Sequence, residues 1–215
     1  MLAEKLAIDP IQLRRMNALH VGSITNTGQL LDESVGLTDC INRLEAEMRQ
    51  SNPDPFTPIA DQDNPHLVRA WGMAAAYKNT GLGGGAPDIS NAEIELYEDG
   101  TFEIRSSAAE LGQGLVSVMQ MIISEEMAVS PDSIRVLVMD TDLTPNGGPT
   151  TASRQTYITG NASRLAAKTL RNAISAFIAE KFDISPDKIE FNDGMVNVDG
   201  HSMPYSEIAK EMKQF

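Results

Sequence analysis

Two polar segments of this chain carry residue types suited to a bound ligand. The longer one, residues 140–156, reads Asp-Thr-Asp-Leu-Thr-Pro-Asn-Gly-Gly-Pro-Thr-Thr-Ala-Ser-Arg-Gln-Thr. It has no hydrophobic period, and a structureless loop of such length inside a domain is uncommon unless it is functional. Hydroxyls, amides and glycines allow a backbone to come close to a polar ligand and to hydrogen-bond with it. The sequence therefore predicts a binding loop, with a solvated loop as the alternative.

The end of this loop holds the strongest candidates. They precede a predicted helix and are Ala152, Ser153, Arg154, Gln155 and Thr156. Small and polar residues in a row can offer backbone and side-chain hydrogen bonds together, and the guanidinium of Arg154 can form a bidentate pair with phosphate. A Ser or Thr that only caps the helix is the simpler explanation.

The shorter segment, Glu110-Leu-Gly-Gln-Gly114, lies where a predicted strand passes into a predicted helix. Its candidate ligand-binding residues are Leu111, Gly112, Gln113 and Gly114. Glycines permit close approach, and the unpaired N–H groups at a helix start attract oxo or phosphate-like groups. The Gln113 amide can donate and accept at once. A tight turn without a ligand is the alternative, and Glu110 is predicted to brace this turn rather than to act as a base.

Hydrophobic periodicity and turn residues place the elements that must position these segments. Helices are predicted at 1–20, 37–49, 115–127, 159–180 and 204–213, and strands at 68–77, 92–98, 101–107, 134–139, 188–191 and 195–198. Asp9 suits a helix N-cap, and Asp99-Gly100 predicts a two-residue hairpin turn. The run 68–77 is continuously apolar, which predicts a strand buried on both faces.

The order of these elements predicts an α+β fold, with an antiparallel or mixed sheet and helices packed on one face. Three prolines within residues 51–58 mark the best candidate boundary, because a helix cannot continue through them. We therefore expect a helical linking segment at 1–58 and an α+β lobe at 59–215.

Composition narrows the classes of partner. A formal net charge of −13 argues against nucleic acid and against anionic membrane surfaces, which both require clustered Lys and Arg. The single cysteine, Cys40, excludes an intrachain disulfide and lies on an apolar helix face, which predicts a buried thiol. The three histidines lack metal-ligand spacing, so no protein-ligated metal is expected. Without a signal-like or membrane-spanning run, the expected location is the cytoplasm.

Taken together, the motifs resemble the molybdopterin-binding subunit of the xanthine dehydrogenase and aldehyde oxidase family. The matching text is Ala109-Glu-Leu-Gly-Gln-Gly114, residues 144–156 and Gly160-Asn161-Ala162. Flanking text at 3–17, 27–34 and 71–75 is similar to the family in the same order, so the resemblance covers essentially the whole chain.

The resemblance implies a molybdenum-cofactor-binding-domain-like fold and a site for molybdopterin with molybdenum. Gln113 would lie near the molybdenum, and residues 152–156 would wrap the pterin and its phosphates. The wording Ser153-Arg-Gln-Thr156 looks like bacterial members that use the cytosine dinucleotide form. The family hydroxylates a carbon centre of a small-molecule substrate, or runs the reductive counterpart. The implied partners are the remaining lobes of the molybdenum subunit and iron–sulfur and flavin subunits or domains.

The sequence also departs from the family. The Gly-x-Gly-Glu setting of the family's catalytic glutamate is missing, and the family's other lobe would lie before Met1. We therefore expect an interior fragment without a catalytic residue, a partial cofactor-binding domain that is inactive alone. The glycine-rich segment 81–86 lacks the family's substrate-channel aromatic, so the substrate class is not carried over. A non-catalytic interaction or assembly subunit is the alternative, and the lack of a P-loop or dinucleotide pattern disfavours a generic nucleotide-binding module.

Overall fold

Capping and turn residues set where the first elements begin and end. In the computed structural model, which describes residues 1–213, the Asp9 carboxylate accepts hydrogen bonds from the N–H groups of Ile11 (2.8 Å) and Gln12 (2.9 Å). Asp9 is thus the N-cap of a helix, as predicted. The single helix predicted at 1–20 is in fact two, because Ala7 adopts a left-handed conformation that ends the first one.

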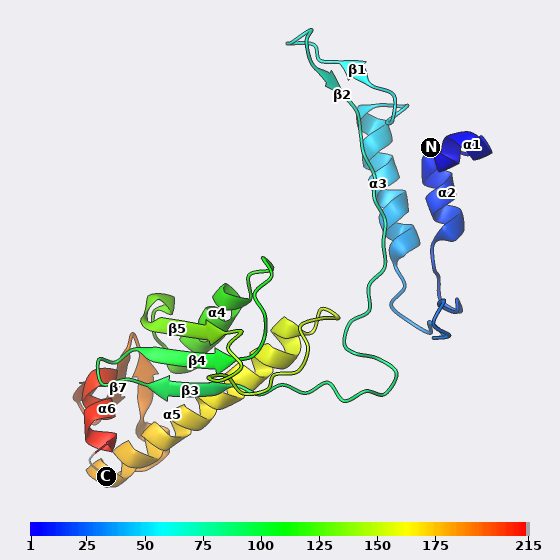
Figure 1. Cartoon of the computed structure of the whole chain (residues 1–215). Coiled ribbons are helices and arrows are strands. Elements are labelled where there is room, and N and C mark those ends of the chain that lie inside the picture. Colours follow the sequence, from blue (N-terminus) through cyan, green and yellow to red (C-terminus); the bar gives the residue numbers. More distant parts are fainter. Residues whose placement is uncertain (214–215) are drawn as a thin grey trace. The chain divides into compact units, whose positions relative to one another are not determined.

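The chain divides into two compact units, Met1–Lys78 and Asn79–Phe215, each described by itself (Figure 1). The first unit contains α1 (Leu2–Leu6), α2 (Pro10–Asn17), α3 (Leu37–Ser51), β1 (Ile59–Ala60) and β2 (Val68–Arg69). Ile11, Ile41 and Met48 are its buried apolar side chains, whereas Cys40 is exposed and not buried as predicted. The roles assigned to 1–58 and 59–215 stay predictions.

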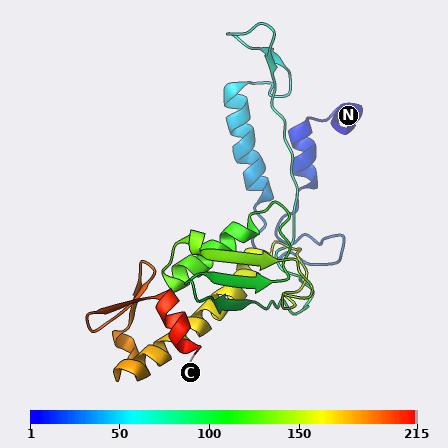
Figure 2. The same cartoon turned by 60° about the vertical axis from the view of Figure 1, so that its left-hand side comes forward.

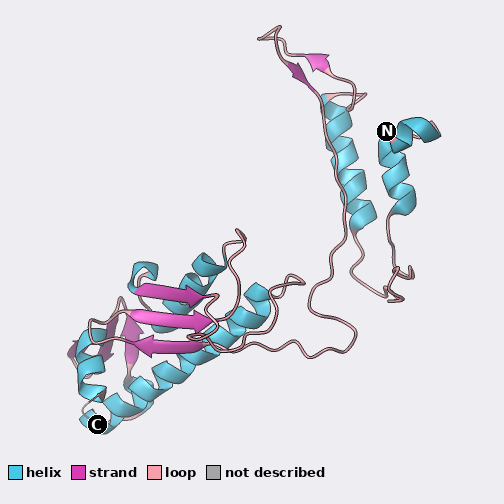
Figure 3. Cartoon of the chain, in the orientation of Figure 1, coloured by secondary structure: helices cyan, strands magenta, loops and turns pink. Residues whose placement is uncertain are grey.

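The strand predicted at 68–77 is wrong for most of its length. Only Val68–Arg69 forms a strand, paired with Ile59–Ala60, and the chain continues as an extended loop (Figure 3). Its large side chains are exposed, with Val68 at 71% and Tyr77 at 60%. An apolar run indicates that its side chains favour burial, but it does not indicate which segments will cover them. Within residues 1–213, no strand pairs with residues 70–77.

The second unit contains the predicted α+β architecture. Its elements are β3 (Glu93–Leu96), β4 (Phe102–Ser106), α4 (Leu115–Met127), η1 (Pro131–Ser133), β5 (Ile134–Val138), η2 (Gln155–Thr159), α5 (Gly160–Phe182), η3 (Pro186–Lys188), β6 (Glu190–Asn192), β7 (Met195–Val198), β8 (His201–Pro204) and α6 (Tyr205–Met212). The strand β8 was not predicted. No helix within residues 1–213 is both long and apolar enough to cross a membrane.

The main sheet is mixed, in the order β3-β4-β5 (Figure 2). The pair β3 and β4 is antiparallel, and β4 and β5 are parallel because α4 crosses over between them. The hairpin loop is longer than predicted. The Tyr97 N–H donates to the Thr101 carbonyl (2.9 Å), and the Tyr97 carbonyl accepts from the Gly100 N–H (2.9 Å). Gly100, at φ 87°, takes the left-handed position of this three-residue connection.

Both long helices lie on one face of this sheet, as predicted. The helix α4 packs against β5, α5 packs against β3, and the two helices pack against each other. The opposite face of β4 carries charged side chains, with Arg105 bridging Glu103 (2.8 Å) and Glu95 (2.6 Å). One apolar face and one ionic face fix the sheet's orientation.

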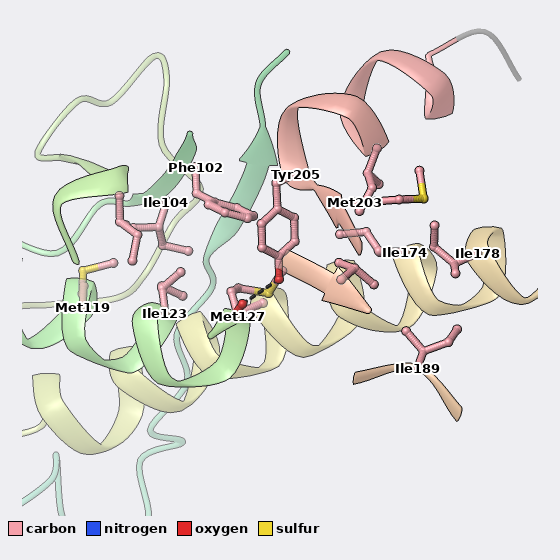
Figure 4. Close-up of a cluster of buried hydrophobic side chains, with 14 of the residues drawn as sticks. Phe102, Ile104, Met119, Ile123, Met127, Ile174, Ile178, Ile189, Met203 and Tyr205 are labelled. Carbon is pink, nitrogen blue, oxygen red and sulfur yellow. Dashed lines mark hydrogen bonds between the residues drawn. The ribbon is translucent and has the colours of Figure 1, made fainter. Parts of the chain in front are cut away.

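The core continues from the sheet to the C-terminal elements (Figure 4). Phe102 on β4 meets Tyr205 on α6 edge to face, with ring centroids 4.9 Å apart. The Tyr205 hydroxyl donates a 2.6 Å hydrogen bond to the Met127 carbonyl at the end of α4. This contact joins the strand, the crossover helix and the last helix into one buried cluster.

Candidate functional site

The two polar segments leave the same edge of the main sheet. One follows β4 and the other follows β5, and parallel neighbours present their carboxyl ends together. The Ala109 N–H donates to the Thr150 hydroxyl (2.8 Å), and the Ser107 N–H donates to the Pro145 carbonyl (3.3 Å). The structure therefore brings residues 109–114 and 144–156 into direct contact, across a long separation in sequence.

A third segment joins them. The glycine-rich stretch 81–85 contacts the long loop where the Gly81 N–H donates to the Ala152 carbonyl (2.8 Å). The Asn91 amide, a few residues on, donates to the Asn146 carbonyl (2.7 Å). The binding residues predicted from the sequence did not include this stretch, whose glycine density was related only to the substrate channel of the family.

Glu110 braces the shorter turn, as predicted. Its carboxylate accepts from the N–H groups of Gly112 (2.8 Å), Gly114 (3.1 Å) and Val116 (3.0 Å). Gly112 and Gly114 have φ values of 94° and 81°, which only glycine adopts readily. The hydrogen bonds from Val116 first, then from the two glycines, lower the pKa of Glu110 below its usual value.

This capping predicts an acid-sensitive turn. Because the folded-state pKa of Glu110 is lowered, its stabilisation is present above the unfolded pKa of about 4.3 and is lost as pH falls through the lower folded value. Glu110→Gln is expected to reduce the amide-exchange protection of Gly112 and Gly114 several-fold at pH 7 and to remove their acid transition. Glu125→Gln, an exposed change on α4, the helix that follows this turn, is the matched control. Unaltered protection in the Glu110 variant would contradict the capping role.

The Gln113 side chain folds back over its own turn. Its amide nitrogen donates to the Ala109 carbonyl (2.8 Å), and its amide oxygen accepts from the Leu111 N–H (2.6 Å). A primary amide has a second N–H and a second lone pair. Since Gln113 is exposed, these remain available to a ligand in a fixed orientation.

The five residues 152–156 divide into an inner and an outer set. Ala152, Arg154 and Gln155 are buried, while Ser153 and Thr156 are exposed. The Gln155 amide donates to the Thr150 hydroxyl (3.0 Å), which in turn accepts from the Ala109 N–H of the shorter segment (2.8 Å). The outer hydroxyls of Ser153 and Thr156 are the side chains that a ligand can reach.

Arg154 is placed differently from the sequence-based expectation. Its side chain is 0% exposed and forms an ion pair with Asp88. The guanidinium also donates to the carbonyls of Pro149 (2.9 Å), Gly147 (3.2 Å) and Ile89. A direct phosphate contact of this guanidinium is therefore not available in this arrangement. Its buried charge organises the loop from within.

Several backbone donors of this loop have no partner among the described residues. Ala152 is only 2% exposed, yet its N–H group, like those of Ser153 and Gln155, makes no hydrogen bond. Unpaired buried donors are rare in proteins, and neighbouring ones form a concave site for an anion. Together with the Ser153 and Thr156 hydroxyls, this donor set suits an anionic group such as a phosphate.

Close packing surrounds Gly147 and Gly148. A Cβ at Gly147 would lie 3.0 Å from the Ser106 hydroxyl and 3.1 Å from the Ser90 hydroxyl. At Gly148 it would lie 3.0 Å from the Ile89 carbonyl. These glycines bring the loop backbone against the sheet edge, which leaves the outer surface of the turn 151–153 to a ligand.

The helix after the loop begins with a π-turn, Gln155–Thr159, ahead of α5. The Ile158 N–H donates to the Arg154 carbonyl (2.7 Å), and the Thr159 hydroxyl contacts the Gln155 amide inside the unit. Such π-turns are rare and concentrate at functional sites. Sequence patterns placed the helix start near Thr159 and gave no signal for the wider turn.

Fold and loops together define a cofactor-binding lobe, and comparison with known proteins specifies it. Residues 47–214 match the family described as molybdopterin cofactor-binding domain. The aldehyde oxidoreductase of Megalodesulfovibrio gigas is 33% identical over 177 residues, covering 80% of this chain and 19% of the relative. The xanthine dehydrogenase molybdenum-binding subunit of Escherichia coli is 31% identical over 183 residues, covering 82% and 23%.

Solved structures agree on the fold. The crystal structure of quinoline 2-oxidoreductase from Pseudomonas putida matches with a TM-score of 0.56 at 17% identity, covering 96% of this chain and 28% of that one. The chain belongs to the molybdopterin cofactor-binding domains of the xanthine dehydrogenase and aldehyde oxidoreductase family. The resemblance inferred from the motifs is thereby confirmed. The chain spans about a fifth of the length of the curated relatives.

Proposed function

We propose that this lobe holds one side of a molybdopterin cofactor of a molybdenum hydroxylase, at the place where the two polar segments meet. The carrying observation is the set of unpaired N–H groups at Ala152, Ser153 and Gln155, beside two exposed hydroxyls. When bound, such a cofactor supplies redox chemistry at carbon that side chains cannot perform, and the protein supplies binding and orientation.

Each site residue has a distinct role in this proposal. The N–H groups of 152–155 and the hydroxyls of Ser153 and Thr156 bind phosphate. Gln113 offers its remaining N–H and lone pair to the pterin or to an oxygen ligand of molybdenum, and Leu111, Gly112 and Gly114 shape the turn that carries it. Arg154 contributes through the loop it holds. Support for the cytosine dinucleotide form is the likeness of 153–156 to bacterial members that use it.

We further propose that the chain alone does not turn over substrate. The two carboxylates that hold the turns of the site are already engaged, Glu110 by three backbone N–H groups and Asp88 by Arg154. Neither is free to accept a proton from a substrate in this arrangement. Catalysis would then require the remaining lobes of the molybdenum subunit, with iron–sulfur and flavin partners to carry electrons. Hydroxylase turnover by the isolated chain would refute this.

Cofactor binding can be tested with the full chain. Purified protein is equilibrated with the molybdenum cofactor, either without a nucleotide or in its cytosine dinucleotide form. It is expected to retain pterin and molybdenum after gel filtration, and to retain more of the dinucleotide form. A lost hydrogen bond to a charged group costs about 1.5–3 kcal/mol, so the double change Ser153→Ala with Thr156→Ala is expected to weaken binding about tenfold or more. The exposed Thr169→Ala on α5 is the control. Retention that is equal in all three proteins would remove the proposed site.

The alternative, a non-catalytic interaction subunit, has one observation in its favour. Residues 70–77 are apolar and largely exposed, and Trp71 retains 43% exposure although its indole N–H donates to the Ser51 hydroxyl. A chain that binds partner protein but no cofactor in the same experiment would favour this role. Cytoplasmic location belongs to the proposal under either reading.

A further inference from the structure

The guanidinium of Arg154 lies between two loop segments, residues 88–89 and residues 147–149. Its side chain is fully buried, and its donors reach carbonyls on both sides of the site, at Ile89 and at Gly147 and Pro149. An arginine has five N–H donors and no acceptor, so it can collect several carbonyls only where the backbone turns them toward it. Arg154 thus fixes the directions of three separate backbone groups at once.

A buried cation needs an anion, and Asp88 provides it. The Asp88 side chain is 21% exposed and pairs with the Arg154 guanidinium through one oxygen. Its other oxygen accepts from the Leu82 N–H (2.9 Å) and lies 2.8 Å from where a Cβ of Gly81 would stand. The Arg154 hydrogen bond, foremost, holds the pKa of Asp88 below its usual range, so the carboxylate stays charged near neutral pH. One carboxylate therefore joins the glycine-rich segment to the long loop.

The backbone next to Arg154 is in an unusual conformation. Ala152 and Ser153 have φ values of 54° and 51°, and a left-handed conformation is unfavourable for residues with a Cβ. Two such residues in succession persist only where their surroundings hold them. Here the Gly81 N–H donates to the Ala152 carbonyl (2.8 Å), and the Arg154 N–H donates to the Thr151 carbonyl (3.2 Å). Both restraints depend on segments that the ion pair joins.

We propose that Asp88 is a positioning residue for the cofactor loop, which acts through Arg154 and the Gly81–Leu82 backbone to hold Ala152 and Ser153 in their left-handed conformation, and so sets the positions of their N–H groups. The role in binding rests on the proposed function, whereas the role in holding the turn rests on the contacts alone. The glycine-rich segment 81–85 thereby becomes part of the site's support.

The test uses the full chain and the variant Asp88→Asn, which keeps the shape and removes the charge. Amide exchange within 147–156 is expected to become about tenfold faster or more, while exchange in the buried parts of α4 and α5 stays as in the wild type. Affinity for molybdopterin cytosine dinucleotide is expected to fall by a similar factor. Asp142→Asn, an exposed change in the same long loop, is the matched control and is expected to alter neither.

The outcomes separate the two ideas. Unchanged exchange at 147–156 in Asp88→Asn overturns the positioning role, and so does an equal loss of protection throughout α4 and α5. Faster loop exchange in a protein whose wild type binds no cofactor upholds the positioning role and refutes the proposed function. If Asp88→Asn does not fold, Asp88→Glu keeps the charge and displaces it by one methylene. Faster loop exchange in that variant supports the role, and wild-type exchange overturns it.

Discussion

Replacing Arg154 with alanine is expected to lower the free energy of unfolding of the second unit by about 3 kcal/mol or more, because removing one member of a buried ion pair strands the other. The change leaves the Asp88 carboxylate and the carbonyls of Gly147 and Pro149 without their donor. The buried Gly147 carbonyl regains no partner for the water it lost in folding, and the Asp88 carboxylate keeps only its hydrogen bond from the Leu82 N–H and its partial exposure to solvent. Few single substitutions at a proposed ligand site would have so large an effect on folding.

Urea unfolding followed by far-UV circular dichroism measures this loss. Arg164→Ala removes the same side chain from an exposed position on α5 and is expected to stay within about 0.5 kcal/mol of the wild type. A free energy of unfolding of Arg154→Ala within about 1 kcal/mol of the control value, roughly the error of the extrapolation, would show that the guanidinium is dispensable to the fold.

The second large effect is expected at the junction of β4 and α6. Phe102 is fully buried and its ring meets Tyr205 edge to face, so Phe102→Ala is expected to cost about 3–5 kcal/mol through lost burial and a new cavity. Tyr205→Phe removes only the hydroxyl that donates to the Met127 carbonyl and is expected to cost about 1 kcal/mol.

The pair of variants distinguishes packing from hydrogen bonding in this cluster. Burial raises the pKa of Tyr205 above its usual value, so its hydroxyl is protonated near neutral pH, where the comparison can be made. Thermal or urea unfolding gives both values. Equal losses from the two substitutions would mean that the hydrogen bond, rather than the aromatic contact, anchors α6.

Hydrophobic periodicity predicted the elements around the site well, because each of them carries a clear helix or strand pattern within its own sequence. The helix α4, Leu115–Met127, has the predicted bounds, and β5 follows where alternation placed it. The run 70–77 failed, since hydrophobicity gives no information on which strands are present to cover it. The strand β8, His-Ser-Met-Pro, is short and polar and carries no strand signal, so pairing with β7 alone creates it.

The site itself was predicted as a place more accurately than as a set of contacts. Composition located both polar segments, and the parallel pairing of β4 and β5 explains why they meet. The direction of the Arg154 side chain was beyond such reasoning, because it depends on Asp88, 66 residues earlier in the chain. A sequence shows that an arginine is able to bind phosphate, but only the fold shows whether its donors are already paired with acceptors of the protein.

The turn at Ala152 and Ser153 is built from residues with side chains although glycine would enter its left-handed conformation more easily. An alanine and a serine have fewer backbone states than glycine in the unfolded chain. Once the Arg154 side chain is paired with Asp88, their N–H groups are therefore preorganised. An anion that binds there meets donors whose positions are already set, and little ordering entropy is subtracted from its affinity. The cost of shaping the site falls on folding, before any ligand is present.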